Sequence, residues 1–279
     1  MISRNLVYAE APTRKGPRAL EADLYLPEGG GAPCDLVVWM HSGGFRSGSR
    51  SHPAHGHIAR AFTDLGYACA FIDYRLARPF AVLRPQTEAA LGALIAEAAA
   101  AGEEMNETFL GERPLAVVED CCAFLNRAAA EAADWGLSGR FLLGGSSAGA
   151  ISTLNTLYLP RHLSLARPGI ATVFAYSGGF GYPPRLWPTG ARILALHNAA
   201  DDKVPVSSIR RFAAATPDAC VLIESAEQVH GSPKLTRGES FVQAIGRAVA
   251  FDRCPDPRGF AAAQPAAQPA EATPEPPRP

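Results

Sequence analysis

The sequence predicts an α/β fold with a mostly parallel central sheet and helices on both of its faces. Apolar runs typical of strands alternate with helix-like segments along most of the chain, which is the pattern of parallel strands joined by right-handed crossovers. Glycine-rich turns follow two of these runs, where open α/β sheets carry their ligand sites. With 279 residues, 47% of them hydrophobic, the chain is long enough to fill one such core.

The expected elements follow from local pattern, starting at the N-terminus. Residues 19–27 alternate apolar and polar side chains, as an edge or antiparallel strand does. Residues 35–41 and 67–75 are continuous apolar runs, as buried parallel strands are, and a helix is expected between them over 53–65. Further along, we expect helices over 85–101, 113–134, 150–159, 205–215 and 239–251, and strands over 140–145, 170–178, 192–198 and 219–225.

Two segments differ from this body. We expect residues 1–254 to form a single domain and residues 255–279 to form a disordered Pro- and Ala-rich tail, because the tail holds eight of the 24 prolines and cannot bury enough apolar surface to fold. The tail is either a dispensable extension or a docking segment.

Composition disfavours several classes of protein. Lys and Arg number 26 and Asp and Glu 27, with no long basic run, so nucleic-acid binding is not expected. No stretch reaches the length of about 18 apolar residues that a membrane helix needs, and the first residues lack the apolar region of a signal peptide. We therefore expect a cytoplasmic chain. The six cysteines have no C-x-x-C spacing, and we expect them to be reduced.

A candidate nucleophile lies between the strand at 140–145 and the helix that follows. The run GSSAG at 145–149 fits G-x-S-x-G, in which small residues permit a sharp turn that exposes the serine above the sheet. This register makes Ser147 the nucleophile. Ser146 is the alternative, with glycine and alanine as its small neighbours, and a plain turn that caps a helix is the other interpretation.

The strand at 35–41 ends in the sequence HSGGF, residues 41–45. Small residues there would let backbone N–H groups face a carbonyl oxygen as it becomes an oxyanion. The N–H of Ala148, the residue after the nucleophile, is the expected further donor. The other interpretation is an ordinary glycine turn.

Three motifs together resemble a known family, the carboxylesterases and lipases of the α/β-hydrolase fold. HSGGF is similar to their H-G-G-G-[FW] loop, FIDYRLA (71–77) to their D-Y-R-L-A segment, and GGSSAGA (144–150) to their nucleophile elbow. The resemblance spans about residues 20–250 and implies the α/β-hydrolase fold.

The resemblance also implies roles for particular residues. Gly43, Gly44 and Ala148 take the oxyanion role, although Ser42 stands where the family usually has glycine. Asp73 and Arg75 are expected to be structural and to tie the strand end to neighbouring loops.

The acid and the base are expected to follow the serine in chain order. The sequence HNAADDKVP after the strand at 192–198 is similar to the family's acid loop, with Asn198 at its usual glycine. This alignment makes Asp201 the acid. Asp202 is the alternative, and a solvated loop carboxylate is the other interpretation. His230, in a small loop before the last helix, stands where the family has its base, unless it is a surface histidine.

The remaining histidines are not expected to be catalytic. His41 and His197 each end a strand and are expected to be structural, and His162 is expected on the surface. The sequence HPAHGH at 52–57 resembles a metal site, but it lacks the glutamate of H-E-x-x-H and any nearby cysteine. We therefore expect a loop that starts a helix, and no metal.

Two segments are expected to shape a substrate pocket. Residues 76–112 form a longer connection than is usual for the family, and we expect a helical lid or wall there. Phe180, Tyr182 and Trp187 in the segment 178–190, together with Phe45, are candidates to line an apolar pocket. The alternative is that these aromatic side chains pack their loop onto the core.

The predicted function is cleavage of a carboxylic ester of small or medium size through an acyl-enzyme, without a cofactor. The expected partner is thus a small-molecule ester, and oligomeric state is left open. An amidase or formamidase, or an acyltransferase, would use the same triad. A non-catalytic binding protein on the same fold is the remaining alternative.

Overall fold

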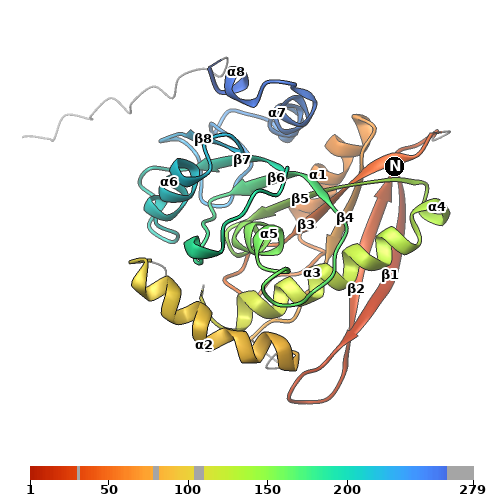
Figure 1. Cartoon of the computed structure of the whole chain (residues 1–279). Helices are drawn as coiled ribbons and strands as arrows, with labels where there is room; N and C mark the ends of the chain where they lie inside the picture. The colour runs from red at the N-terminus through yellow and green to blue at the C-terminus, as the bar shows by residue number, and fades with distance from the viewer. Residues whose placement is uncertain (30–31, 78–81, 104–109, 263–279) are drawn as a thin grey trace, which may run out of the picture.

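One eight-stranded sheet organises the part of the chain that the structure, a computed structural model, describes: residues 1–29, 32–77, 82–103 and 110–262. Its order is β1-β2-β4-β3-β5-β6-β7-β8 (Figure 1). The strand β2 runs antiparallel to both of its neighbours, β1 and β4. The strands β3 to β8 run parallel to one another. The strands are β1 (Ile2–Ala11), β2 (Arg18–Leu26), β3 (Cys34–Met40), β4 (Ala68–Ile72), β5 (Leu137–Ser146), β6 (Ile170–Tyr176), β7 (Arg192–His197) and β8 (Cys220–Glu224).

Helices cover both faces of this sheet, as the sequence predicts (Figure 1). The longer ones pack in pairs, α1 against α7 on one face and α3 against α5 on the other. The helices are α1 (Pro53–Asp64), α2 (Pro85–Ala100), α3 (Glu112–Ala130), α4 (Ala132–Trp135), α5 (Ala148–Tyr158), α6 (Val206–Ala215), α7 (Phe241–Arg253) and α8 (Pro257–Ala262), with the 3-10 turn η1 (Pro183–Arg185).

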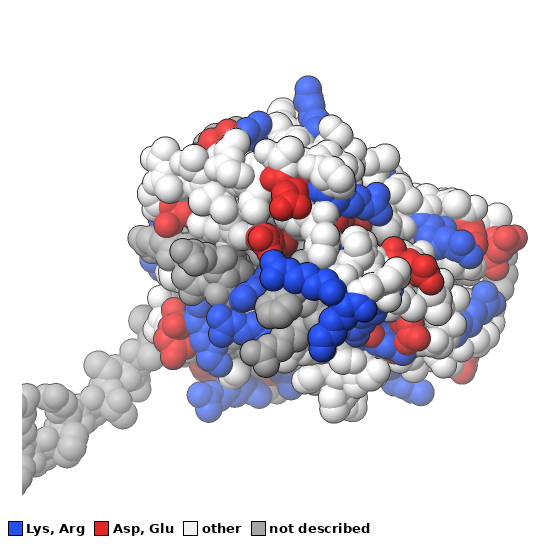
Figure 2. All heavy atoms as spheres, turned by 90° about the horizontal axis from the view of Figure 1, so that it is seen from below, with Lys and Arg blue, Asp and Glu red and all other residues white. Residues whose placement is uncertain are grey.

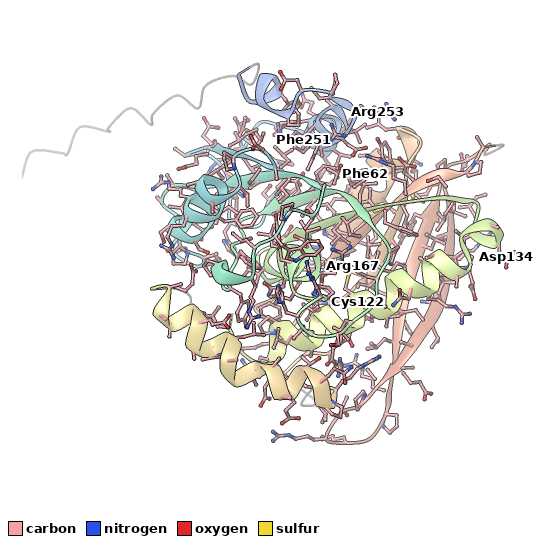
Figure 3. The ribbon with its side chains drawn as sticks, in the orientation of Figure 1. Phe62, Cys122, Asp134, Arg167, Phe251 and Arg253 are labelled. Atoms are coloured by element: carbon pink, nitrogen blue, oxygen red, sulfur yellow. The ribbon has the colours of Figure 1, made fainter. Side chains whose placement is uncertain are left out.

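The core has two parts, one on each face of the sheet. Alternate side chains of β3 enter different parts: Leu36 and Val38 belong to the cluster under α3 and α5, whereas Val37 belongs to the cluster under α1 and α7. This alternation follows from the period of two along a strand. Figure 3 shows Phe62 and Phe251 in the second cluster and Cys122, across the sheet, in the first.

One described strand, β1, and one described α-helix, α8, are not predicted from the sequence. The strand β1 pairs with β2 through nine residues of register, but its first five residues are exposed or half-buried and follow no buried apolar pattern. The tail predicted to be disordered from residue 255 instead begins with the helix α8. Phe260 there is 9% exposed and packs edge-on against Phe251, at 5.3 Å between ring centroids. Residues 263–279 lie outside the described residues.

Ion pairs hold the end of β4 in place, as predicted for Asp73 and Arg75. Arg75 is buried and pairs with Glu119 and Asp120 of α3, each at 2.7 Å. Asp73 accepts hydrogen bonds from the backbone N–H of Arg50, at 2.9 Å, and from its guanidinium, at 2.5 Å. The strand end is therefore tied to α3 on one side and to the segment before α1 on the other.

Charge on the surface is mixed. On the face seen in Figure 2, Lys and Arg side chains gather in the lower middle of the view, and Asp and Glu side chains lie around them. Both signs are thus present on this face, in keeping with the formal net charge of -1. None of the described helices has the length and apolar character to cross a bilayer.

Candidate active site

The turn between β5 and α5 holds Ser147 in a strained conformation. Its φ of 53° and ψ of -117° lie where side chains are rarely found. Small neighbours are required on both sides. A Cβ added to Gly145 would lie 2.5 Å from the carbonyl carbon of Gly149, and one added to Gly149 would lie 2.0 Å from the carbonyl oxygen of Met40. The turn is therefore possible only with glycine at both positions.

The structure brings Ser147, and not Ser146, to the histidine. The Oγ of Ser147 lies 2.8 Å from Nε2 of His230. Ser146 is instead the last residue of β5 and lies in register with Tyr176 of β6. Of the two serines, Ser147 has the geometry of a nucleophile beside its base.

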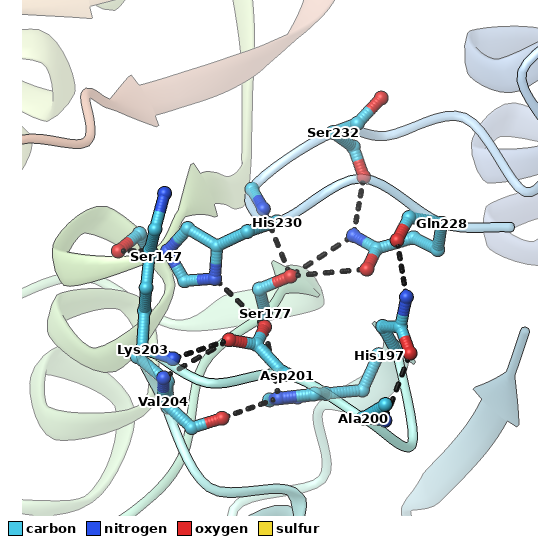
Figure 4. Close-up of polar contacts among 12 residues, drawn as sticks. Ser147, Ser177, His197, Ala200, Asp201, Lys203, Val204, Gln228, His230 and Ser232 are labelled. Carbon is cyan, nitrogen blue, oxygen red and sulfur yellow. Dashed lines mark hydrogen bonds and ion pairs between the residues drawn. The ribbon is translucent and has the colours of Figure 1, made fainter. Parts of the chain in front are cut away.

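The other ring nitrogen of His230 contacts Asp201, the predicted acid. Its Nδ1 lies 2.7 Å from Oδ2 of Asp201, a contact drawn as a dashed line in Figure 4. The Asp201 side chain is fully buried. The second oxygen, Oδ1, accepts the backbone N–H groups of Lys203 at 2.9 Å and Val204 at 3.1 Å. Asp202, the alternative acid, is exposed in the same loop. The structure thus places Asp201, and not Asp202, against the histidine.

Hydrogen bonds keep the Asp201 carboxyl ionised. Burial by itself would raise its pKa, but the hydrogen bonds from His230, Val204 and Lys203 together lower the pKa below its ordinary value. A charged carboxylate at this place favours the proton on Nδ1 of His230, which leaves Nε2 free to accept the hydroxyl proton of Ser147.

The segment 41–45 lies directly against the nucleophile turn. A Cβ added to Gly149 would lie 2.7 Å from the carbonyl oxygen of His41. Gly43 and Gly44 both have positive φ, 122° and 59°, and the Gly43 carbonyl accepts the N–H groups of two residues further on in the turn. Ala148 is the first residue of α5, so its N–H has no acceptor within the helix. The N–H groups of Gly43 and Gly44 thus belong to the segment packed against the turn, and the N–H of Ala148 belongs to the residue after Ser147.

Comparison with known proteins supports this architecture. Residues 22–100 match the family model described as BD-FAE. Similar solved structures include esterase 2 of Thermogutta terrifontis phosphorylated by paraoxon (16% identity, 90% of this chain and 94% of that chain covered, TM-score 0.65). Its propionate-bound form matches at 17% identity, with 89% and 93% covered and a TM-score of 0.62. No curated protein is a significant match.

The chain has the α/β-hydrolase fold. The fold predicted from sequence is thereby confirmed. The BD-FAE match begins within β2 and covers the segment that includes β3, the 41–45 turn and β4. Ser147, Asp201 and His230 lie beyond it, so their roles depend on the geometry described above.

In this α/β-hydrolase fold the predicted pocket aromatics are packed into the protein. Phe45, Phe180 and Tyr182 are each at most 1% exposed. The ring of Phe180 packs on Tyr158 at 5.3 Å, and the indole N–H of Trp187 donates to the Tyr158 carbonyl at 2.9 Å. These contacts correspond to the alternative in which the aromatic residues pack their loop onto the core. A role in lining a substrate pocket stays a prediction.

The predicted lid, residues 76–112, is described in part. Its helix α2 packs against α3 and η1, and Glu97 of α2 forms an ion pair with Arg185 of η1. Residues 78–81 and 104–109 lie outside the described residues. The lid function therefore stays a prediction.

The histidines of the HPAHGH segment serve the start of α1. Nδ1 of His52 accepts the N–H of Ala54 and so caps the helix. Nδ1 of His55 contacts the Arg50 carbonyl at 2.7 Å, and burial lowers the pKa of His55 to about 4. The described residues contain no cluster of three or more His, Cys, Asp or Glu side chains suited to a metal.

His41 and His197 are buried, as expected of structural residues. His41 stacks on Tyr74 with 4.0 Å between ring centroids. His197 contacts the Val204 carbonyl at 2.9 Å, and its Nε2 lies 3.5 Å from Oδ2 of Asp201. Burial lowers the pKa of His197, which favours the neutral form of this ring beside Asp201.

Three polar residues beside His230 are not expected at the site from the sequence: Ser177, Gln228 and Asn198, the last of which is notable there only because it replaces a glycine. Figure 4 shows Ser177 and Gln228 among the contacts next to His230. Ser177 is buried and has a φ of 53°, a rare value for a serine. Its position directly after β6, the strand beside the nucleophile strand, is the signal that could have found it.

Proposed function

We propose that the protein is a serine hydrolase that cleaves a carboxylic ester through an acyl-enzyme intermediate. The observation that carries the proposal is the continuous hydrogen-bonded chain from Ser147 through His230 to Asp201, with links of 2.8 Å and 2.7 Å. This chain begins at a strained turn after a parallel strand, where the α/β-hydrolase fold presents a nucleophile. The similar structures of an esterase that is phosphorylated by paraoxon or holds propionate favour an ester as substrate.

In the first half of the reaction, Oγ of Ser147 attacks the ester carbonyl carbon while its proton passes to Nε2 of His230. The ring becomes an imidazolium, which the Asp201 carboxylate stabilises. The carbonyl oxygen becomes an oxyanion, and the N–H groups of Gly43, Gly44 and Ala148 are the proposed donors to it. Such a donor typically lowers the barrier by about 3–4 kcal/mol.

Collapse of this intermediate breaks the bond to the alcohol oxygen. His230 returns its proton to that oxygen, and the alcohol leaves the acyl group on Ser147. In the second half, water attacks the acyl carbonyl while His230 takes a proton from it. The tetrahedral intermediate then releases the carboxylic acid, and His230 gives the proton back to Ser147.

The proposal is tested by labelling and by hydrolysis. The protein is treated with a fluorophosphonate, the labelled peptide is identified by mass spectrometry, and p-nitrophenyl esters of increasing acyl length are assayed. We expect the label on Ser147. Ser147→Ala should lower kcat by about 10⁴-fold or more, while Ser146→Ala, the matched control, should still be labelled and active. A label on Ser146, or no label on folded protein, would refute the assignment.

A further inference from the structure

The triad joins two separate loops, and their relative position sets its hydrogen-bond lengths. Asp201 lies in the loop between β7 and α6, and His230 lies in the loop between β8 and α7. Both residues stand in turns and irregular backbone. Because a shift of about 1 Å can slow a reaction by about 100-fold, contacts that hold one loop against the other bear directly on catalysis.

Asn198 bridges these two loops with its side chain. Its Nδ2 donates to the backbone carbonyls of Gln228 at 2.7 Å and Ala226 at 3.2 Å, both in the histidine loop. Its Oδ1 accepts the N–H of Ala200 at 2.8 Å, in the acid loop. The carboxamide thus makes three hydrogen bonds, and a glycine at this position would make none of them.

Gln228 fixes the histidine loop from within. Its side chain is 2% exposed. Nε2 donates to Oγ of Ser177 at 2.9 Å and to the carbonyl of Ser232 at 3.0 Å. The same Ser177 Oγ accepts the N–H of Gly231 at 2.9 Å. The backbone is therefore held on both sides of His230, before it at Gln228 and after it at Gly231, as Figure 4 shows for Gln228, Ser177 and Ser232.

We propose that Asn198, Gln228 and Ser177 are positioning residues that act as a clamp, holding His230 in line with both Asp201 and Ser147. The clamp anchors the histidine loop to the ends of two strands, because Ser177 directly follows β6 and Asn198 directly follows β7. The inference deepens the proposed function and rests on it for its catalytic consequence. The placement of the ring in the free protein does not depend on any substrate.

The test compares two clamp variants with a matched control. Asn198→Gly removes all three amide hydrogen bonds, and Gln228→Met keeps a side chain of similar length without donors or acceptors. Asn126→Ala is the control, because Asn126 also donates to a backbone carbonyl, that of Ala166 at 2.8 Å, but does so from α3. For p-nitrophenyl ester hydrolysis we expect each clamp variant to lower kcat by about 10- to 100-fold with KM within about threefold. The control should match the wild type.

Proton NMR of the free protein gives a readout that needs no activity. The proton on Nδ1 of His230, bonded to Asp201, should give a far-downfield signal that is absent from Asp201→Ala. We expect it in the wild type and in Asn126→Ala, and we expect it to be lost or shifted upfield in both clamp variants. Circular dichroism verifies that each variant is folded at the temperature used.

The outcomes separate the clamp from the proposed function. If both clamp variants keep the signal and a kcat within twofold of the wild type, the clamp is refuted, whether or not Ser147 is the nucleophile. If the wild type shows the signal but neither labels nor hydrolyses any ester, the proposed function fails. The loss of the signal in the clamp variants would then still support the positioning role.

Discussion

At the scale of single residues, Ser147 combines a hydroxyl that lies 2.8 Å from Nε2 of His230 with a backbone conformation that glycine tolerates better. Ser147→Ala and Ser147→Gly both remove the hydroxyl, but only glycine relieves a φ of 53°. Such strain costs about 1–3 kcal/mol of stability, and the glycine variant avoids this cost. Glycine in turn lowers stability by about 0.5–1 kcal/mol, because its unfolded chain is more flexible. We expect the glycine variant to be more stable than the alanine variant by about 1 kcal/mol. Thermal unfolding of the two variants checks this, and an alanine variant that melts at or above the glycine variant would contradict it.

Gly149 is constrained for a different reason, the space around it. A Cβ there would lie 2.0 Å from the carbonyl oxygen of Met40, which is backbone and cannot rotate away. We expect Gly149→Ala to destabilise the protein by about 1–3 kcal/mol and to abolish ester hydrolysis, because the turn must shift. Gly246→Ala on α7 is the control, since its Cβ meets nothing within 4 Å. If the two variants have equal midpoints in urea, the steric argument is wrong.

The sequence names the three residues that the structure brings into contact, Ser147, Asp201 and His230. Ser147 stands in a turn motif between a strand and a helix, whereas Asp201 and His230 are expected from the family resemblance. The clamp residues could not be predicted in this way. Asn198 and Gln228 are 30 positions apart, and only the pairing of β7 with β8 brings their loops together.

At the scale of elements, Asp252 joins α7 to the sheet. This buried carboxylate of α7 accepts hydrogen bonds from Arg140 of β5, Thr172 of β6 and Tyr67. Burial by itself would raise its pKa, but these hydrogen bonds together lower the pKa of Asp252 below its ordinary value. The unfolded chain therefore takes up a proton at Asp252 at a higher pH than the folded chain does. The stability that this group contributes is complete above about pH 4 and is lost as the pH falls through the folded-state pKa.

Asp252→Ala tests this linkage. At pH 7 the variant leaves buried donors without a partner, and we expect it to be less stable than the wild type by about 1–3 kcal/mol. Below about pH 4 the wild type begins to lose this contribution, so the difference between the two proteins should shrink. Urea unfolding at pH 7 and pH 3 measures both values. A difference that stays constant between the two pH values would contradict the role of the ionised carboxylate.

Helices and strands could be predicted from the sequence where burial determines the pattern of apolar residues. Residues 36–40 of β3 and all of β4 are apolar without interruption because both faces of the sheet are covered there, and this pattern is visible in the sequence. The strand β1 depends on backbone pairing with β2, which leaves no such pattern. The helix α8 has Phe260 as an apolar anchor in a run rich in Pro and Ala, so its composition resembles that of a disordered segment.

At the scale of the whole molecule, the candidate site depends on several strands of the sheet at once. Its serine, acid and histidine follow β5, β7 and β8, and the clamp adds the end of β6. The carboxyl ends of parallel strands meet at one edge, so four neighbouring strands supply the site only when the sheet is fully formed. Activity should therefore be lost in the same transition as the packing of both core clusters.

The reactivity of the six cysteines can be used to follow this unfolding transition, because they are free and distributed over the molecule. Cys34 and Cys254 are half-buried, whereas Cys69, Cys121, Cys122 and Cys220 are buried on the two faces of the sheet. Burial raises the pKa of Cys122 and Cys220 to about 12, and it also raises the pKa of Cys69 and Cys121. The thiolate is the reactive form.

We therefore expect a thiol reagent such as dithionitrobenzoate to modify at most the two half-buried cysteines of the native protein. The four buried thiols should react only as fast as the protein unfolds, and their modification should parallel the loss of ester hydrolysis in urea. All six should react at once in denaturant. Rapid reaction of four or more thiols in the active protein would show that one face of the sheet opens independently of the site.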